Sequence, residues 1–344
     1  MKRNLLLIFF SFLISFFLIE IFIRIFLPQE ISAPWRIHAK DGLLINKNNG
    51  ISYHYINSKK VKYTFGKYHN RKYNLQQSKK KILVLGDSFT FGWLLNDEDT
   101  FIYKLSKNFL NYEFINASAG GWGTSDYLKY LEEFCDMIKP KHTIIFINYM
   151  DFSRSKVSNL YYLNSKNEII EGKNKVYLSD KLTESFIYSF FAANSHLFNL
   201  FRKQMTIFIL NKRIQDQKTK IQNEKNLKNN EIKISEDDKL KNDIIFIKKL
   251  LKKIKLKNDE CKSNLILINL GWIEFKNTSN VDNINNYISF IRENSINYID
   301  LTNNMRLIHN EKSKYQIKND GHPNELANEI IYQLIKDKLK IYIQ

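Results

Sequence analysis

A serine stands where a short apolar run ends, in a position that suits a nucleophile. Residues 82–85 read Ile-Leu-Val-Leu and are followed by Gly86, Asp87 and Ser88. Such a run, closed by these residue types, predicts a buried strand that ends in a turn. A serine at a strand-to-helix turn presents its hydroxyl and keeps a free backbone N–H, as a nucleophile beside an oxyanion hole requires. A serine that merely caps a helix fits the same tripeptide.

A histidine near the carboxyl end of the chain has the partner that a general base needs. Asp320, Gly321 and His322 stand together before an amphipathic segment at 324–339, which predicts a helix. One ring nitrogen must be bound to an acceptor if the other is to take a proton. Asp320 can supply that acceptor across a tight turn at Gly321. The alternative is a loop in which the two side chains share no role.

A glycine-rich loop follows the second predicted strand at 112–115. It reads Gly120-Gly121-Trp122-Gly123, and its backbone amides would face the same pocket as Ser88. The spacing fits neither GxGxxG nor GxxxxGK[ST], which argues against nucleotide binding. A plain tight turn is the alternative.

Strands and helices alternate along most of the chain. Further strands are predicted at 51–56, 60–65, 143–147, 265–268 and 296–301, and further helices at about 100–109 and 124–138. Alternation of this kind predicts a parallel sheet covered by helices on both faces. Ligands of such sheets bind beyond the carboxyl ends of the strands, where Ser88 and the glycine loop are expected.

Four segments together resemble the blocks of the SGNH (GDSL-type) hydrolase family. They read ILVLGDSFTFG, INASAGGWGTSDY, INYMDFSR and DGHPNELANEI, and the resemblance covers about residues 80–155 and 264–340. It implies a flavodoxin-like three-layer α/β/α sandwich with a central parallel sheet. It also implies ester chemistry through an acyl-enzyme, for which neither metal nor cofactor is expected. The G-x-S-x-G elbow of α/β-hydrolases is absent.

The resemblance also assigns roles to individual residues. Ser88 would be the nucleophile, His322 the general base and Asp320 its orienting partner. The backbone N–H groups of Ser88 and Gly121 would form the oxyanion hole.

The third block departs from the family pattern. The family places an oxyanion-hole asparagine immediately before the aspartate, but here Met150 precedes Asp151. A thioether cannot donate a hydrogen bond. Asn148 has the strand parity of Met150, but it is set back by about 6.6 Å along an extended strand. We therefore expect a weakened oxyanion hole, with Asn148 as an alternative donor only if the chain bulges there.

The amino-terminal region is apolar over residues 5–27, which is long enough for a membrane span of roughly 20 residues. Glu20 and Arg24 interrupt it and, four residues apart, can pair on one helix face. No small-residue cleavage site follows the apolar run, so an uncleaved signal anchor is favoured over a cleaved signal peptide. Lys2 and Arg3 favour a cytoplasmic amino end. The remaining domain is then expected outside the cytoplasm, in the periplasm or at the cell surface.

We expect an anchor at 1–28, a juxtamembrane segment at 29–80 and a hydrolase-like domain at 81–344 with an insertion at about 152–243. The second half of the insertion, from about 211, is rich in polar residues and predicts a solvated helix or a mobile loop. For the aromatic first half we expect a packing role, rather than a cap on the site or a membrane contact. Its aromatic residues include Phe186, Phe190, Phe191, Phe198 and Phe201.

Charge and cysteine content exclude several classes of protein. Lys and Arg number 53 against 35 Asp and Glu, a net charge of +18, but the lysines are spread along the chain. We interpret this excess as compositional bias and expect no nucleic-acid partner. Two distant cysteines, Cys135 and Cys261, exclude a disulfide framework and a cysteine-rich metal site. We expect buried free thiols. A single disulfide bridge between these cysteines is the alternative if the domain is exported.

The leading hypothesis is a membrane-anchored esterase or O-acyltransferase. Its substrate would be an acyl ester, in particular an acetyl ester, of a cell-envelope glycan or lipid. The alternative is a catalytically weakened binding or assembly protein of the cell envelope on the same scaffold. The sequence fixes neither the acyl group and its acceptor nor the oligomeric state.

Overall fold

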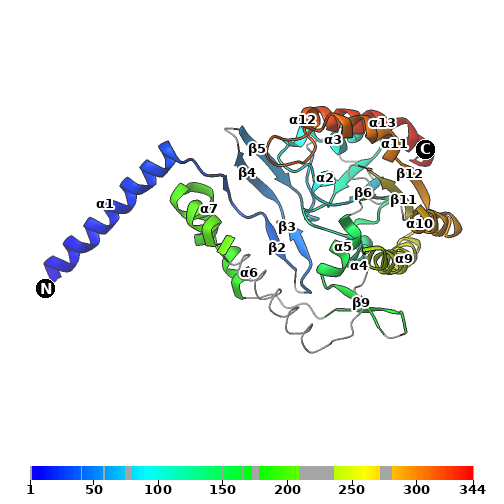
Figure 1. Cartoon of the computed structure of the whole chain (residues 1–344), viewed down its shortest axis with the longest axis horizontal. Helices are drawn as coiled ribbons and strands as arrows, with labels where there is room; N and C mark the ends of the chain where they lie inside the picture. Colours follow the sequence, from blue (N-terminus) through cyan, green and yellow to red (C-terminus); the bar gives the residue numbers. More distant parts are fainter. Residues whose placement is uncertain are drawn as a thin grey trace. The chain divides into compact units, whose positions relative to one another are not determined.

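The computed structural model describes residues 2–39, 41–56, 59–73, 80–148, 150–164, 166–172, 178–205, 207–208, 236–271 and 281–343 (Figure 1). The chain forms two compact units. The amino-terminal unit comprises Met1–Pro34, Tyr53–Val61 and Lys181–Ile234. The α/β unit comprises Trp35–Ser52, Lys62–Asp180 and Ser235–Gln344. The predicted division at residues 28 and 80 differs from this grouping and stays a prediction.

A five-stranded parallel sheet is the centre of the α/β unit. Its strands are β6 (Lys81–Leu85), β7 (Glu113–Asn116), β8 (His142–Ile147), β11 (Asn264–Asn269) and β12 (Asn297–Asp300). The order across the sheet is β12-β11-β8-β6-β7, and every neighbouring pair is parallel. Counted in chain order, this is 5-4-3-1-2, the flavodoxin-like arrangement. The predicted fold class is confirmed.

Helices cover both faces of the sheet and complete three layers, as Figure 1 shows for α3 and α13 on one side and α4 and α9 on the other. One face packs on α3 (Phe101–Asn108), α11 (Thr302–Asn310) and α13 (Glu325–Ile343). The other face packs on α4 (Thr124–Ile138), α9 (Glu236–Glu260) and α10 (Val281–Glu293). Alternate strand residues serve the two faces, with Leu83 toward α4 and Val84 toward α3. Both faces are therefore apolar, which explains the unbroken apolar runs.

The predicted strands and helices are present within a few residues of their expected ends. Two short antiparallel pairs were not predicted, because two or three residues show no periodicity. They are β2 (Arg36–His38) with β3 (Leu44–Asn46), and β9 (Tyr161–Leu163) with β10 (Ile169–Glu171). The remaining short elements of this unit are α2 (Ser88–Phe91), η1 (Asp97–Asp99), α5 (Met150–Val157) and α12 (Lys312–Tyr315).

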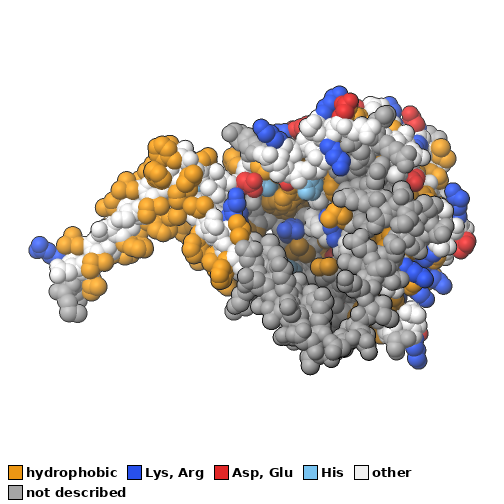
Figure 2. Space-filling view, in the orientation of Figure 1, with side chains coloured by type: hydrophobic (Ala, Val, Ile, Leu, Met, Phe, Trp, Pro, Cys, Tyr) orange, Lys and Arg blue, Asp and Glu red, His pale blue; other side chains and the backbone are white. Residues whose placement is uncertain are grey.

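The amino-terminal unit contains α1 (Lys2–Phe26), which is long and apolar enough to cross a membrane. Hydrophobic side chains cover this helix in Figure 2. The predicted pair is present, with Arg24 Nη2 3.2 Å from Glu20 Oε1. Other elements are β1 (Ile31–Ser32), α7 (Phe186–Asn194) and a further helix over 196–205. Three elements have residues in both units: β4 (Gly50–Ile56), β5 (Lys59–Phe65) and α6 (Leu178–Thr183).

The aromatic first half of the insertion is more exposed than predicted. Phe186 and Phe201 are 83% and 66% exposed, and Phe190 and Phe191 are also exposed. The predicted packing role is therefore wrong for Phe186, Phe190 and Phe201, whereas the Phe191 ring lies 5.8 Å from that of the partly buried Phe198. Of the polar second half, residues up to 235 lie outside the described residues, and the remainder begins α9.

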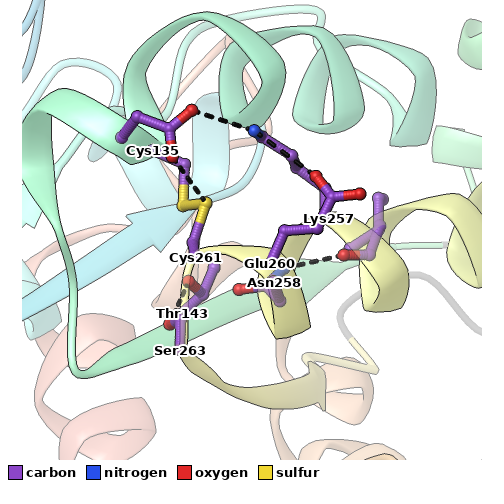
Figure 3. Close-up of a disulfide and its surroundings, with 9 residues drawn as sticks. Cys135, Thr143, Lys257, Asn258, Glu260, Cys261 and Ser263 are labelled. Atoms are coloured by element: carbon purple, nitrogen blue, oxygen red, sulfur yellow. Dashed lines mark hydrogen bonds and ion pairs between the residues drawn. A yellow bond between two sulfur atoms is a disulfide. The ribbon is translucent and has the colours of Figure 1, made fainter.

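The two cysteines form a disulfide, so the prediction of free thiols is wrong (Figure 3). Cys135 lies on α4, and Cys261 directly follows α9. These two helices pack on the same face of the sheet, which brings together cysteines 126 residues apart. Lys257 Nζ and Asp136 Oδ2 also pair across these helices, at 3.0 Å. The packing of α9 on α4 is a tertiary contact that cysteine spacing does not reveal.

Removal of this disulfide should destabilise the α/β unit. Closure of so long a loop constrains the unfolded chain, so Cys135→Ser with Cys261→Ser should lower the free energy of unfolding by about 2–4 kcal/mol. Guanidinium unfolding of the oxidised and the doubly substituted protein measures this. Met137→Ser, at an exposed position on α4, is the control and should change stability by less than about 0.5 kcal/mol. Equal stability of the two proteins would contradict the structural role of the bridge.

Candidate active site

Ser88 is the first residue of α2, directly beyond the carboxyl end of β6. Asp87 caps this short helix, and its Oδ1 accepts a hydrogen bond from the N–H of Phe89 at 2.9 Å. The strand order reverses at β6, since the second strand lies on one side of it and the third on the other. Ser88 thus occupies the switch point at which sheets of this order bind ligands.

His322 and Asp320 meet Ser88 although 234 positions separate the serine from the histidine. His322 Nε2 lies 2.8 Å from Ser88 Oγ. The other ring nitrogen, Nδ1, is hydrogen-bonded to Asp320 Oδ1, which also accepts the His322 backbone N–H at 3.1 Å. Gly321 makes the required turn at φ +93°. With the ring proton on Nδ1, donated to the carboxylate, Nε2 is free to accept the serine hydroxyl proton.

Aromatic residues fix this imidazole and its carboxylate. The rings of Phe89 and Trp93 lie 4.9 and 5.9 Å from the His322 ring, and Trp93 Nε1 donates to Asp320 Oδ2 at 3.3 Å. Burial raises the pKa of the Asp320 carboxyl, but the hydrogen bonds and charge of His322 outweigh it and hold that pKa below its ordinary value. Asp320 therefore stays ionised and can stabilise a protonated imidazole.

The glycine loop lies against the serine. The Ala119 N–H donates to the Gly86 carbonyl at 3.2 Å, which ties the loop to the turn before Ser88. A Cβ added at Gly120 would lie 3.8 Å from the Ser88 Cβ. Gly121 has a φ of +83° and open space around it. Among the described residues, neither the Gly121 N–H nor the Ser88 N–H has an acceptor, so both are available to an oxyanion.

An arginine that the sequence did not single out completes this side of the site. Arg36, on β2, donates from Nη1 to the Gly120 carbonyl at 3.0 Å. The Arg36 side chain is exposed, and no carboxylate in the described part of the chain pairs with it. The site therefore holds a positive charge near Ser88. Because 84 positions separate Arg36 from Gly120, only the fold reveals this contact.

The third block does not have the geometry assumed from its sequence. β8 ends at Ile147 and α5 begins at Met150, so the chain turns where an extended strand was expected. Asn148 is buried at this turn and donates from Nδ2 to Asp87 Oδ2 at 3.1 Å. Met150 is 39% exposed. The prediction that Asn148 is set back by two residues along an extended strand was therefore wrong, and Asn148 lies beside Asp87, which precedes Ser88.

A buried cluster of charges holds the first and third blocks together. Arg154 Nη1 lies 2.7 Å from Asp87 Oδ2 and 3.7 Å from Asp151 Oδ1. Asp151 Oδ2 accepts the Tyr127 hydroxyl and the Asn148 N–H, each at 2.9 Å. Burial raises the pKa of Asp151 well above its usual range, and the neighbouring Asp87 carboxylate raises it further. Sequence reasoning missed Arg154, although it stands three residues after Asp151 in the same block.

Comparisons with known proteins give similarity at the level of structure. Neither a family model nor a curated protein sequence matches the chain. Solved structures that it resembles include the esterase EstA from Pseudoalteromonas sp., at TM-score 0.41 and 14% identity over 77% of this chain and 99% of that one. Another is the acetylxylan esterase Axe2 from Geobacillus stearothermophilus, at 0.41 and 12% over 77% and 95%. A third is a lipolytic G-D-S-L family member from Veillonella parvula, at 0.39 and 10% over 76% and 98%.

Removal of Arg154 should destabilise the fold, because the buried Asp87 carboxylate would lose the positive charge that pairs with it. Arg154→Met should lower the free energy of unfolding by about 3–5 kcal/mol, because Asp87 is almost fully buried. The double variant Asp87→Asn with Arg154→Met should recover most of this loss in urea unfolding. Lys255→Met, which breaks an exposed pair with Asp259, is the control and should cost less than about 1 kcal/mol. A double variant no more stable than Arg154→Met would refute the pairing.

Proposed function

We propose that this chain is a serine esterase or O-acyltransferase that works through an acyl-enzyme. The observation that carries the proposal is the hydrogen-bonded series from Ser88 to His322 to Asp320 at the switch point of the sheet. Such a series activates a hydroxyl for attack on an acyl carbonyl.

Each group has a definite task in this proposal. Neutral His322 takes the Ser88 proton at Nε2 as Oγ attacks the carbonyl carbon, and Asp320 stabilises the imidazolium that forms. The oxyanion accepts hydrogen bonds from the N–H groups of Ser88 and Gly121. The ester C–O bond then breaks, and His322 returns the proton to the leaving alcohol. Water or an acceptor hydroxyl attacks the acyl-enzyme next and frees the serine.

Asn148 is the candidate third donor of the oxyanion hole. One of its amide hydrogens binds Asp87, and the other has no acceptor among the described residues. Met150, which stands at the family's asparagine position, has no hydrogen-bond donor in its side chain.

We propose that the enzyme acts outside the cytoplasm on acyl esters, in particular acetyl esters, of envelope glycans or lipids. The Cys135–Cys261 disulfide supports an oxidising compartment. Retention of α1 as a membrane anchor is supported by Glu20, which accepts hydrogen bonds from the N–H groups of His196 and Leu197. Cleavage of the anchor as a signal peptide would remove this partner from the folded protein.

The nucleophile is tested with a serine-reactive fluorophosphonate. Wild type should be labelled and should hydrolyse short acyl esters, whereas Ser88→Ala should do neither and keep its circular dichroism. Ser153→Ala, at an exposed position on α5, is the matched control and should behave as wild type. Labelling of Ser88→Ala at the wild-type rate would overturn the assignment. Absence of labelling in folded wild type would favour the binding or assembly protein on the same scaffold.

Asn148→Ala should lower kcat and leave KM nearly unchanged, because the lost donor acts on the transition state. The expected loss is about 10²–10³ in rate, the usual effect of one oxyanion-hole donor. Met150→Ala, at the neighbouring exposed position, should change kcat by no more than a small factor. Steady-state kinetics on a chromogenic acetyl ester measure both. An unchanged kcat in Asn148→Ala would remove this residue from the oxyanion hole.

A further inference from the structure

The carboxylate within the apolar helix α1 is bound by the start of another helix. Glu20 accepts hydrogen bonds from the N–H groups of His196 and Leu197, each at 2.9 Å, and from the Ser195 hydroxyl at 2.8 Å. These N–H groups belong to the first turn of the helix over 196–205 and have no partner inside it. A negative charge at a helix amino end is stabilised there. Glu20 thus joins α1 to that helix.

Arg24 on α1 binds the carboxyl end of α7, the helix that precedes residues 196–205. Its Nη2 donates to the carbonyl of Asn194, the last residue of α7, at 2.7 Å. The backbone N–H of Gln29 donates to His196 Nδ1 at 2.9 Å. α7 and the helical residues 196–205 and 207–208, here called the helical hairpin, are therefore fixed against the carboxyl end of α1.

The helical hairpin exposes most of its large apolar side chains. Of the residues of α7, only Ala192 is buried. Phe198 packs inside the hairpin, with its ring 5.2 Å from that of Tyr188 and 5.8 Å from that of Phe191. The exposed apolar residues are Phe186, Ile187, Phe190, Phe191, Phe201, Met205, Ile207 and Phe208. Surfaces of soluble proteins seldom carry so many large apolar groups together.

We propose that the helical hairpin lies in the lipid bilayer beside α1, in the leaflet that contains the carboxyl end of that helix. This proposal rests on the proposed membrane anchoring of α1. The apolar surface of the hairpin continues that of α1, whose side chains are exposed from Leu5 to Leu27 except at a few positions (Figure 2). α7 has nine residues, about 14 Å of helix, which is too short for a hydrocarbon core of about 30 Å. α7 therefore enters one leaflet and does not cross the membrane.

The side-chain N–H groups of two asparagines have acceptors inside the hairpin, whereas the buried Asn199 Oδ1 has no partner among the described residues. Asn199 is buried and donates from Nδ2 to the carbonyls of Ala192 and Ser195, at 2.9 and 2.7 Å. Asn194 Nδ2 donates to the Phe190 carbonyl at 2.8 Å. Internal partners of this kind are needed where water is absent. Lys203 is exposed between Phe201 and Met205, and a side chain of this length can extend to the headgroups of anionic lipids.

Spin-label accessibility in the full-length protein tests the proposal. The single variants Ile187→Cys, Phe190→Cys and Phe201→Cys are labelled with a nitroxide, and each protein is reconstituted in phosphatidylcholine–phosphatidylglycerol vesicles. The native cysteines are joined in a disulfide and do not react. Leu13 on α1 is the control for the anchor. Val157 on α5, 83% exposed, is the control for water.

The readout is the ratio of nitroxide collisions with oxygen to collisions with a polar nickel chelate. At the three hairpin positions this ratio should exceed that at Val157 by about tenfold or more, because a polar chelate is excluded from hydrocarbon. Ratios equal to that at Val157 at all three positions would overturn the proposal. Protection from both reagents would overturn it too, since it indicates a protein partner. A high ratio at Leu13 with low ratios at the hairpin positions would refute only the bilayer location of the hairpin. A low ratio at Leu13 would refute the membrane anchoring of α1 itself.

Discussion

The parallel pairing of β6 with β8 determines where the residues of the candidate site lie. It places the carboxyl ends of the first and third strands of the sheet side by side, with Leu85 opposite Ile145. Ser88 follows one strand and Asn148 follows the other. β7 pairs on the far side of β6 and brings the glycine loop to the same edge. The loop before α13 then has to supply only the imidazole and its carboxylate.

Charge burial at this edge explains why the residues around Ser88 are polar. Asp87 caps α2 and is also bound by Asn148 and Arg154, so the turn that presents Ser88 is held from three directions. A buried carboxylate is tolerated only when it is paired and hydrogen-bonded. Arg154 provides that pairing from α5. The third block thus supports the geometry of the first, although Met150 precedes Asp151 in it.

The sequence was most informative where function depends on local geometry. Asp320 and His322 meet across one turn at Gly321, and their contact could be predicted because they stand only two positions apart in the sequence. The parallel sheet could be predicted because strands buried on both faces are apolar throughout. Asn148 was misjudged because the prediction needed the residue at which β8 ends, and element boundaries are the weakest part of such predictions. Arg36 and the disulfide depend on contacts between distant segments, which neither periodicity nor spacing encodes. The exposed phenylalanines of α7 were predicted to pack within the protein, because composition alone does not separate a protein interior from a lipid-facing surface.

The most direct test of the account is the acylation rate when the base loses its orienting carboxylate. Rapid mixing of wild type and Asp320→Asn with a chromogenic acetyl ester gives the rate of alcohol release in the first turnover. If Asp320 holds His322 in the tautomer that accepts the Ser88 proton, this rate should fall by about 10⁴, with an unchanged circular dichroism spectrum. A fall of less than about tenfold, against the 10⁴ seen when a triad carboxylate is lost, would contradict a catalytic series of Ser88, His322 and Asp320.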